Sequence, residues 1–360
     1  MVTRSFRPCI LYRMGDFLVT VQKIFFELPI ISAGKEHTMK KLVALTLTLV
    51  LLLTSCFILT GCPSPDDGKF TVGVCQLVQH AALDQATEGF IKALKDELGE
   101  ENVEIEVKYA SGDINVCNTI VTDFVSKGVD LIMANATPAL QAAANATLNK
   151  PILGTSITEY GVALGTTLNN GVVGGNVSGT SDLAPLDQQA QMILDFCPDV
   201  EKVGILYCSA EANSAYQVEE VKKFLEAKGV EVQKFSFDDS NSISAVLEAA
   251  CAWSDAIYVP TDNKAADNAE LIGNIVRERN VPTFTGEENT AKACGVASLT
   301  ISYYDLGVTT GKMAAKILKG EADVSTMKIE YAEPAFKYNP EMCEFFGLTA
   351  PEGYVPMDME

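Results

Sequence analysis

Histidine and tryptophan are scarce in this chain. Its 360 residues include two histidines and one tryptophan. His80 is the single histidine after residue 37, which excludes a metal site with several histidine ligands from that part of the sequence. Many sugar sites stack the ring on an aromatic side chain, but Trp253 lies in an expected core helix, so a site of that kind is disfavoured.

Positively charged residues are also few. Lys and Arg number 27 against 47 Asp and Glu, which gives a formal net charge of −20. Such an acidic balance repels nucleic acids and anionic membrane surfaces, so we expect no nucleic-acid partner. Its simplest consequence is solubility.

Motifs of the common enzyme classes are missing. The chain has no Gly-x-Ser-x-Gly elbow, no Walker lysine and no Gly-x-Gly-x-x-Gly that opens a helix. The glycines between Gly171 and Gly179 have no basic residue among them, so they do not form a phosphate loop. His80 could act as a general base only beside a nucleophile, and none is evident. We therefore expect no catalytic residue, no cofactor and no bound metal.

One long uncharged segment near the N-terminus is rich in Leu, Val and Thr. Residues 42–61 carry no charge, follow Lys40 and Lys41, and end in Leu-Thr-Gly before Cys62. A basic start, an apolar stretch and small residues before a cleavage point are typical of a signal peptide. Cleavage before Cys62 would leave a thiol for lipidation at the new N-terminus. A transmembrane anchor is the alternative for the segment, and Cys56 is the alternative lipidation site.

These features divide the N-terminal part of the chain. Residues 1–38 make little sense as structure, and we interpret them as sequence upstream of a true start at Met39. The signal peptide is then 39–61 and a polar tether is 62–69. The mature protein would be extracytoplasmic, tethered to the membrane through lipidated Cys62.

The cysteines after Cys62 do not have the spacing of a disulfide framework. Seven cysteines remain, an odd number, widely scattered and without a Cys-x-x-Cys pair. That pattern fits neither a disulfide scaffold nor a zinc site. We expect most of these cysteines to be small buried hydrophobes.

The rest of the chain alternates short β-rich runs with amphipathic helical segments. Strands are expected at 70–74, 103–107, 130–134 and 151–154, with helices at 82–98, 114–127 and 138–148 between them. After a Gly-rich break at 161–182 the alternation restarts. It gives helices at 186–196, 214–228, 243–253 and 265–279, and strands at 203–207, 230–235, 256–259 and 281–284. A strand at 295–301 and a helix at 304–318 follow.

This order predicts an α/β fold of two Rossmann-like lobes with parallel sheets, joined by a hinge. The first lobe is expected to comprise 70–183 plus about 303–325, and the second 184–302 plus about 326–350. Ligands of open parallel sheets lie beyond the carboxyl ends of the strands. Two lobes whose strand ends face each other form a cleft that a hinge can close on a solute.

Several strand-to-helix loops carry polar residues at these ends. Thr137 and Pro138 are typical of a helix start, whose free amides favour an anion, although plain capping explains them too. Asn213 or Ser214 is expected to cap the helix at 214–228. Asp262 directly follows a buried strand, where it would either pair with a ligand ammonium or cap the next helix.

Together these loops resemble the tryptophan/tyrosine-type solute-binding proteins of ABC importers, which have the type I periplasmic-binding fold. The resemblance covers about residues 70–335. It is carried by the segments 76–84, 136–139, 174–182, 211–214, 258–263, 303–307 and 314–318. It implies a receptor that binds a free amino acid, often an aromatic one, between its lobes and delivers it to a permease with its ATPase.

The resemblance also implies roles for individual residues. Thr137, Asn213 and Ser214 would hold the ligand carboxylate, and Asp262 the ammonium. Gln76, His80 and Glu287 would shape the side-chain pocket. The full expected binding set is Gln76, His80, Thr137, Pro138, Ser156, Asp182, Asn213, Ser214, Thr261, Asp262, Asn263 and Glu287.

Some positions depart from the family pattern. Ala136 stands where the family often has Gly, and Gln79 and Ala81 replace a common Glu and Pro beside His80. Cys208-Ser209-Ala210 replaces the usual Asn-Pro-Gly. These changes leave the identity of the solute open. A sugar or nucleoside receptor of the same fold remains an alternative. A sensory module and an enzyme are two further alternatives. We expect the protein to act as a monomer.

Overall fold

The computed structural model describes residues 68–359. Met39, the signal peptide at 39–61 and Cys62 lie outside the described residues, as does most of the tether. Residues 67–360 form one compact unit by themselves. Among residues 68–359, no helix combines the length and apolar character needed to cross a bilayer.

The first lobe is built on a parallel sheet with the strand order β11-β5-β4-β3-β1-β2. Its strands are β1 (Phe70–Gln76), β2 (Val103–Tyr109), β3 (Leu131–Asn135), β4 (Ile152–Ile157), β5 (Val177–Ser181) and β11 (Glu330–Tyr331). Its helices are α3 (Ala81–Leu98), α4 (Ile114–Lys127), α5 (Thr137–Ala146), α6 (Tyr160–Leu164) and α13 (Tyr303–Leu318), with a 3-10 turn at Glu100–Asn102 and another at Val324–Thr326.

Side chains of the central strands alternate between two apolar layers, as a sheet covered on both faces requires. Val72 and Val74 pack with α3 and α13 on one face. Cys75 of the same strand packs with α4, α5 and α6 on the other. Both layers are buried, which explains why these strands appear in the sequence as nearly continuous hydrophobic runs.

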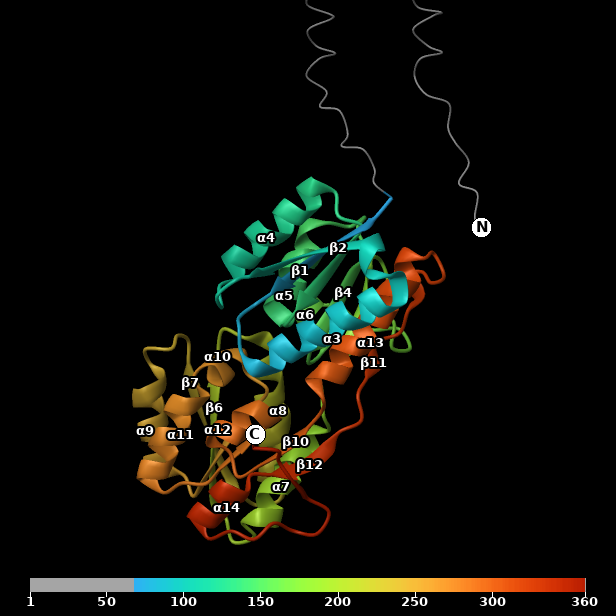
Figure 1. Ribbon diagram of the computed structural model, residues 1–360. Helices are drawn as coiled ribbons and strands as arrows, with labels where there is room; N and C mark the ends of the chain where they lie inside the picture. The colour runs from blue at the N-terminus through green and yellow to red at the C-terminus, as the bar shows by residue number, and fades with distance from the viewer. Residues whose placement is uncertain (1–67, 360) are drawn as a thin grey trace, which may run out of the picture. The chain divides into compact units, whose positions relative to one another are not determined.

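Helices α3 and α13 lie side by side although they are far apart in the sequence (Figure 1). Glycines allow the close approach. A Cβ added to Gly307 would lie 2.0 Å from the carbonyl oxygen of Ala86, and one added to Gly89 would lie 2.2 Å from that of Tyr304. Helix α13 thus packs on the first lobe although it follows the second lobe in the sequence.

The second lobe has a sheet with the order β13-β12-β10-β9-β8-β6-β7. Its strands are β6 (Lys202–Cys208), β7 (Glu231–Phe237), β8 (Ala256–Val259), β9 (Thr283–Thr285), β10 (Ala297–Thr300), β12 (Ala335–Tyr338) and β13 (Val355–Pro356). Strands β6 to β10 are parallel, and β12 runs antiparallel to β10. The helices are α7 (Leu186–Phe196), α8 (Ala212–Ala227), α9 (Ile243–Trp253), α10 (Asn263–Asp267), α11 (Ala269–Arg279), α12 (Glu288–Cys294) and α14 (Pro340–Phe346).

Three details differ from the sequence-based expectations. The helix expected at 265–279 is two helices, because the chain turns at Asn268, whose side chain bonds the Lys264 carbonyl at 2.8 Å. The Gly-rich break contains strand β5. The last return to the second lobe also comes later than residue 326, because β11 at Glu330–Tyr331 still pairs with β5.

Candidate functional site

A narrow cavity lies where the carboxyl ends of the strands of both lobes meet. Its cavity volume is about 10 Å³, roughly the space that one water molecule needs. The residues that line it follow β1, β4, β5, β6, β8, β9 and β10, which is the edge where parallel sheets bind ligands. They are His80, Leu83, Ser156, Thr158, Asp182, Asn213, Thr261, Asp262, Asn263, Ala266, Glu287, Thr290 and Tyr303.

Eight of the twelve predicted binding residues lie on this wall: His80, Ser156, Asp182, Asn213, Thr261, Asp262, Asn263 and Glu287. Gln76, Thr137, Pro138 and Ser214 are buried nearby but are not among the lining residues. Tyr303 and Thr158 are cavity residues that were not predicted. Tyr303 opens a helix directly after a strand, which is the signal that could have revealed it.

The side-chain amide of Gln76 makes its hydrogen bonds within the first lobe. Its amide nitrogen donates to the Val78 carbonyl at 2.8 Å and to Asp84 Oδ1 at 2.6 Å. Its oxygen accepts from the Thr87 hydroxyl at 2.6 Å. These bonds tie β1 to α3, so Gln76 supports the cavity wall from behind.

Helix α5 does not begin as expected. Its N-cap is Ala136, with Thr137 and Pro138 as the first two helical residues. Ala136 has φ 88° and ψ 155°, a region that favours glycine. The turn is therefore made by the Ala136 backbone, and the predicted capping role of Thr137 was wrong.

Helix α8 also begins earlier than predicted, with Glu211 as its N-cap. The Asn213 amide nitrogen instead donates to the Thr261 carbonyl at 3.0 Å. The Ser214 hydroxyl lies beside Asp262, where it favours the ionised form of that carboxyl. Asn213 and Ser214 thus hold the loop after β8 in place and do not cap their own helix.

Two acidic residues of the cavity wall are helix caps. Asp262 Oδ1 accepts from the Ala265 amide at 2.8 Å, and its Oδ2 accepts from the Cys208 amide at 2.6 Å. Glu287 accepts from the amides of Asn289 and Thr290 at 2.7 and 2.8 Å. Of the two readings of Asp262, capping is the one that these contacts support.

Three cavity residues have a buried polar atom without a hydrogen-bond partner in the described part of the chain. These atoms are Ser156 Oγ, Asp182 Oδ1 and Asn213 Oδ1. Leaving such atoms unpaired is costly, by roughly 1–3 kcal/mol each. Their convergence on one cavity indicates a place prepared for the polar groups of a ligand.

Asp182 is the most perturbed of the three. The Tyr303 hydroxyl donates to its Oδ2 at 2.9 Å, and the Thr158 hydroxyl nearby also favours the charged form. Burial outweighs both and raises the pKa of Asp182 to about 6. A buried carboxyl with a free oxygen is suited to pairing with a cation.

The electrostatics of the wall favour a positively charged group. Asp182, Asp262 and Glu287 line the cavity, while its lining, taken from residues 68–359, includes no lysine or arginine. Burial lowers the pKa of His80, which keeps the imidazole neutral near pH 7. His80 Nε2 lies 3.4 Å from Asn263 Oδ1 of the other lobe, so the two lobes touch directly across the cavity.

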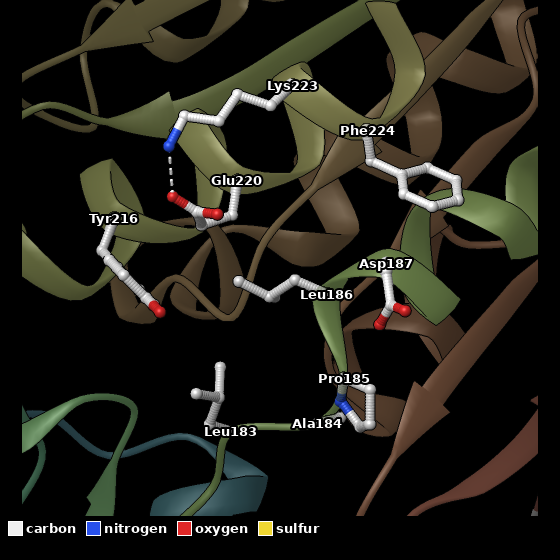
Figure 2. A pocket seen from close by; sticks show the side chains of 9 residues that line it. All are labelled: Leu183, Ala184, Pro185, Leu186, Asp187, Tyr216, Glu220, Lys223 and Phe224. Carbon is white, nitrogen blue, oxygen red and sulfur yellow. Dashed lines mark hydrogen bonds and ion pairs between the residues drawn. The ribbon is translucent and has the colours of Figure 1, made fainter. Parts of the chain in front are cut away.

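A second hollow lies between the crossover at 183–187 and α8 (Figure 2). Tyr216 and Phe224 line it, and Glu220 and Lys223 form an ion pair of 2.6 Å with each other. None of the unpartnered buried atoms found in residues 68–359 belongs to it. It is an open surface feature and carries no predicted site residue.

Two α/β lobes around a polar, carboxylate-lined cavity define a binding protein for a small solute. The family model of ABC transporter substrate binding proteins matches residues 71–355. A tyrosine-binding protein of Clostridioides difficile is 32% identical over 295 residues, which cover 79% of this chain and 85% of the relative. The chain belongs to this family of ABC transporter substrate-binding proteins.

Solved structures share the fold closely. An ABC domain from Streptococcus pneumonia in complex with L-Trp is 32% identical, covers 80% of this chain and 99% of its own, and has a TM-score of 0.76. A ligand-free, open structure of a substrate-binding protein from Clostridium difficile is also 32% identical, with 81% and 100% covered and a TM-score of 0.62. At equal identity, the present structure superimposes better on the ligand complex than on the open form.

Proposed function

We propose that this protein is the extracytoplasmic receptor of an amino-acid importer and that it binds a free aromatic amino acid in the interlobe cavity. The observation that carries the proposal is the set of unpartnered acceptors at Asp182 and Asn213. An α-ammonium group supplies three donors and a positive charge, which matches both atoms. The Ser156 hydroxyl is available to donate to the ligand carboxylate.

This assignment moves the ammonium partner from Asp262 to Asp182. Asp262 already receives backbone donors on both oxygens. Oδ1 of Asp182 has no hydrogen-bond partner in the described residues. The aromatic preference rests on the relatives, one named for binding tyrosine and one solved with L-Trp, each 32% identical to this chain.

The receptor performs no chemistry on its solute. Capture works by hinge closure: the wall is contributed by both lobes, and a solute can enter only when they part. The closed form then docks on a permease with its ATPase. Lipidated Cys62 tethers the protein to the membrane, and the receptor acts as a monomer without cofactor or metal.

The test is thermal unfolding of residues 63–360 against the twenty amino acids, with sugars and nucleosides as controls. Ligand at about a hundred times its dissociation constant adds about 2.7 kcal/mol to the free energy of unfolding. We expect the midpoint to rise with tyrosine, tryptophan or phenylalanine. A rise only with sugars or nucleosides would keep the transport role and overturn the ammonium assignment. If no compound acts, mass spectrometry of the denatured protein must reveal a retained amino acid, or the proposal fails.

A further inference from the structure

A buried carboxylate lies behind the cavity wall and is not itself part of the lining. Glu211 caps α8 and is 5% exposed. Its Oε2 accepts from Asn263 Nδ2 at 2.7 Å, from the Asn263 amide at 3.2 Å and from Asn213 Nδ2 at 3.3 Å. Its Oε1 accepts from the Lys264 amide at 3.1 Å.

Burial and the neighbouring Asp262 raise the pKa of Glu211 to about 7. Above that pH Glu211 is a carboxylate that can only accept hydrogen bonds, and this fixes the orientation of both asparagines. Asn213 Nδ2 also meets the Thr261 carbonyl, another pure acceptor, at 3.0 Å. Each asparagine must therefore turn its nitrogen toward Glu211. Asn213 Oδ1 is left free at the cavity, and Asn263 Oδ1 is left facing His80.

The orientation of Asn263 in turn decides which nitrogen of His80 carries the proton. A neutral imidazole has one donor and one acceptor nitrogen. Asn263 Oδ1 accepts only, so the hydrogen bond to His80 requires a proton on Nε2. Nδ1 is then a hydrogen-bond acceptor. Glu211, Asn263 and His80 thus form a chain of hydrogen bonds from the second lobe to the first.

We propose that Glu211 is a positioning residue that sets the hydrogen-bond polarity of the cavity. It holds Asn213 and Asn263 with their oxygens outward and thereby fixes His80 in the Nε2–H tautomer. The wall then presents acceptors to the solute and selects a group rich in donors. This last step, selectivity for an ammonium, rests on the proposed function; the tautomer does not.

The decisive variant is Glu211→Gln, which keeps the size of the side chain and adds donors. In either orientation its NH2 group opposes at least one of the N–H groups that now point at Glu211. Asn263 is then free to turn, and His80 loses its single tautomer. Glu220→Gln is the matched control, because it makes the same change at a partly exposed position of the same helix, where Glu220 contacts Lys223 and no cavity residue.

The first measurement is nitrogen NMR of the imidazole in histidine-labelled protein comprising residues 63–360. His80 is the only histidine in that range, so both ring signals belong to it, and their couplings to the two carbon-bound ring protons distinguish Nε2 from Nδ1. We expect a protonated Nε2 and an unprotonated Nδ1 in the wild type and in Glu220→Gln. In Glu211→Gln and in Asn263→Ala the two signals should move toward each other. Glu211→Asp should restore the wild-type pattern.

The second measurement compares the affinities for L-tyrosine and for its deamino analogue, 3-(4-hydroxyphenyl)propionate. We expect the preference of the wild type for the amino acid to fall at least tenfold in Glu211→Gln and to persist in Glu220→Gln. Identical imidazole spectra in the wild type, Glu211→Gln and Asn263→Ala would overturn the positioning role. If the wild type binds no amino acid, the proposed function fails, while the spectra still decide the role of Glu211. If Glu211→Gln does not fold, the Asn263→Ala spectrum decides.

Discussion

The Tyr303 hydroxyl donates a hydrogen bond of 2.9 Å to Oδ2 of Asp182 and leaves Oδ1 of that carboxyl without a partner in the described residues. The two residues lie at crossings between the lobes: Asp182 follows the last long strand of the first lobe, and Tyr303 begins the helix that returns to it. A ligand ammonium on Oδ1 would therefore bind directly beside the hinge. In the proposed mechanism, this geometry would couple solute binding to closure.

Replacing Asp182 by Asn should remove most of the affinity for the amino acid. The substitution keeps the shape but deletes the charge that pairs with the ammonium. Loss of one partner of a buried charge pair costs about 2–5 kcal/mol, which corresponds to at least about thirtyfold in the dissociation constant. Isothermal titration with tyrosine measures the change. An affinity within threefold of the wild type would disprove the pairing.

Asp262→Asn is the informative comparison. The two carboxylate oxygens of Asp262 accept hydrogen bonds from the amides of Cys208 and Ala265. The asparagine side chain would place an NH2 donor against one of these two amides. We expect the free energy of unfolding to fall by roughly 1–3 kcal/mol, with the dissociation constant changed less than in Asp182→Asn. Denaturant titration and calorimetry together separate the two effects. The opposite ranking of the dissociation constants would return the ammonium role to Asp262.

The pKa of Asp182 predicts how this residue affects stability with pH. Burial raises the pKa from 3.8 in the unfolded chain to about 6 in the folded protein. The stabilising contribution is thus complete below about pH 4 and is lost as the pH rises through 6. Relative to Asp182→Asn, the ligand-free wild type should lose about 3 kcal/mol in total as the pH rises from below 4 to above 6, because each unit of the pKa difference between the folded and unfolded protein is worth about 1.4 kcal/mol.

Chemical unfolding of both proteins at several pH values tests this statement. The difference between them should be near its minimum at pH 4 and reach a plateau above pH 7. The affinity for an amino acid should show the reverse trend and weaken below pH 6, because a protonated Asp182 no longer attracts an ammonium. A constant difference in stability across this range would mean that the carboxyl is not desolvated.

Much of the fold could be predicted because it depends on local periodicity. The bounds of α4, α7 and α9 coincide with the expected helices, since each has an apolar stripe between clear ends. Strand β5 was missed because Val177–Ser181 is short and polar in composition. It forms a strand only because β4 and the distant β11 pair with it.

The candidate site was predictable in its location but not in its polarity. Loops that follow parallel strands must converge, so eight expected residues do line the cavity. Which acid keeps a free oxygen depends on contacts between distant segments. Asp262 receives the Cys208 amide, which lies 54 residues earlier in the chain, whereas Asp182 receives the Tyr303 hydroxyl on Oδ2 and has no partner for Oδ1 in the described residues.

Ala136→Gly should stabilise the protein. Ala136 has φ 88°, where a Cβ is unfavourable, and such strain costs of order 1–3 kcal/mol. Glycine relieves it at some cost in unfolded-state entropy, so we expect a net gain of about 1 kcal/mol. Ala144→Gly within the same helix should lose about 1 kcal/mol. Thermal unfolding of both variants distinguishes relief of strain from a general effect of glycine, and a destabilised Ala136→Gly would contradict the prediction.

Gly307→Ala should damage the packing of α13 against α3. The added Cβ would lie 2.0 Å from the Ala86 carbonyl oxygen, so the helices would have to separate. Overpacking of this kind typically costs 1–3 kcal/mol. Because α13 also begins with Tyr303 of the cavity wall, its displacement should weaken solute binding as well. Lys312→Ala, on the exposed side of the same helix, should change neither quantity. A Gly307→Ala protein with unchanged stability would show that α3 and α13 are not in such close contact.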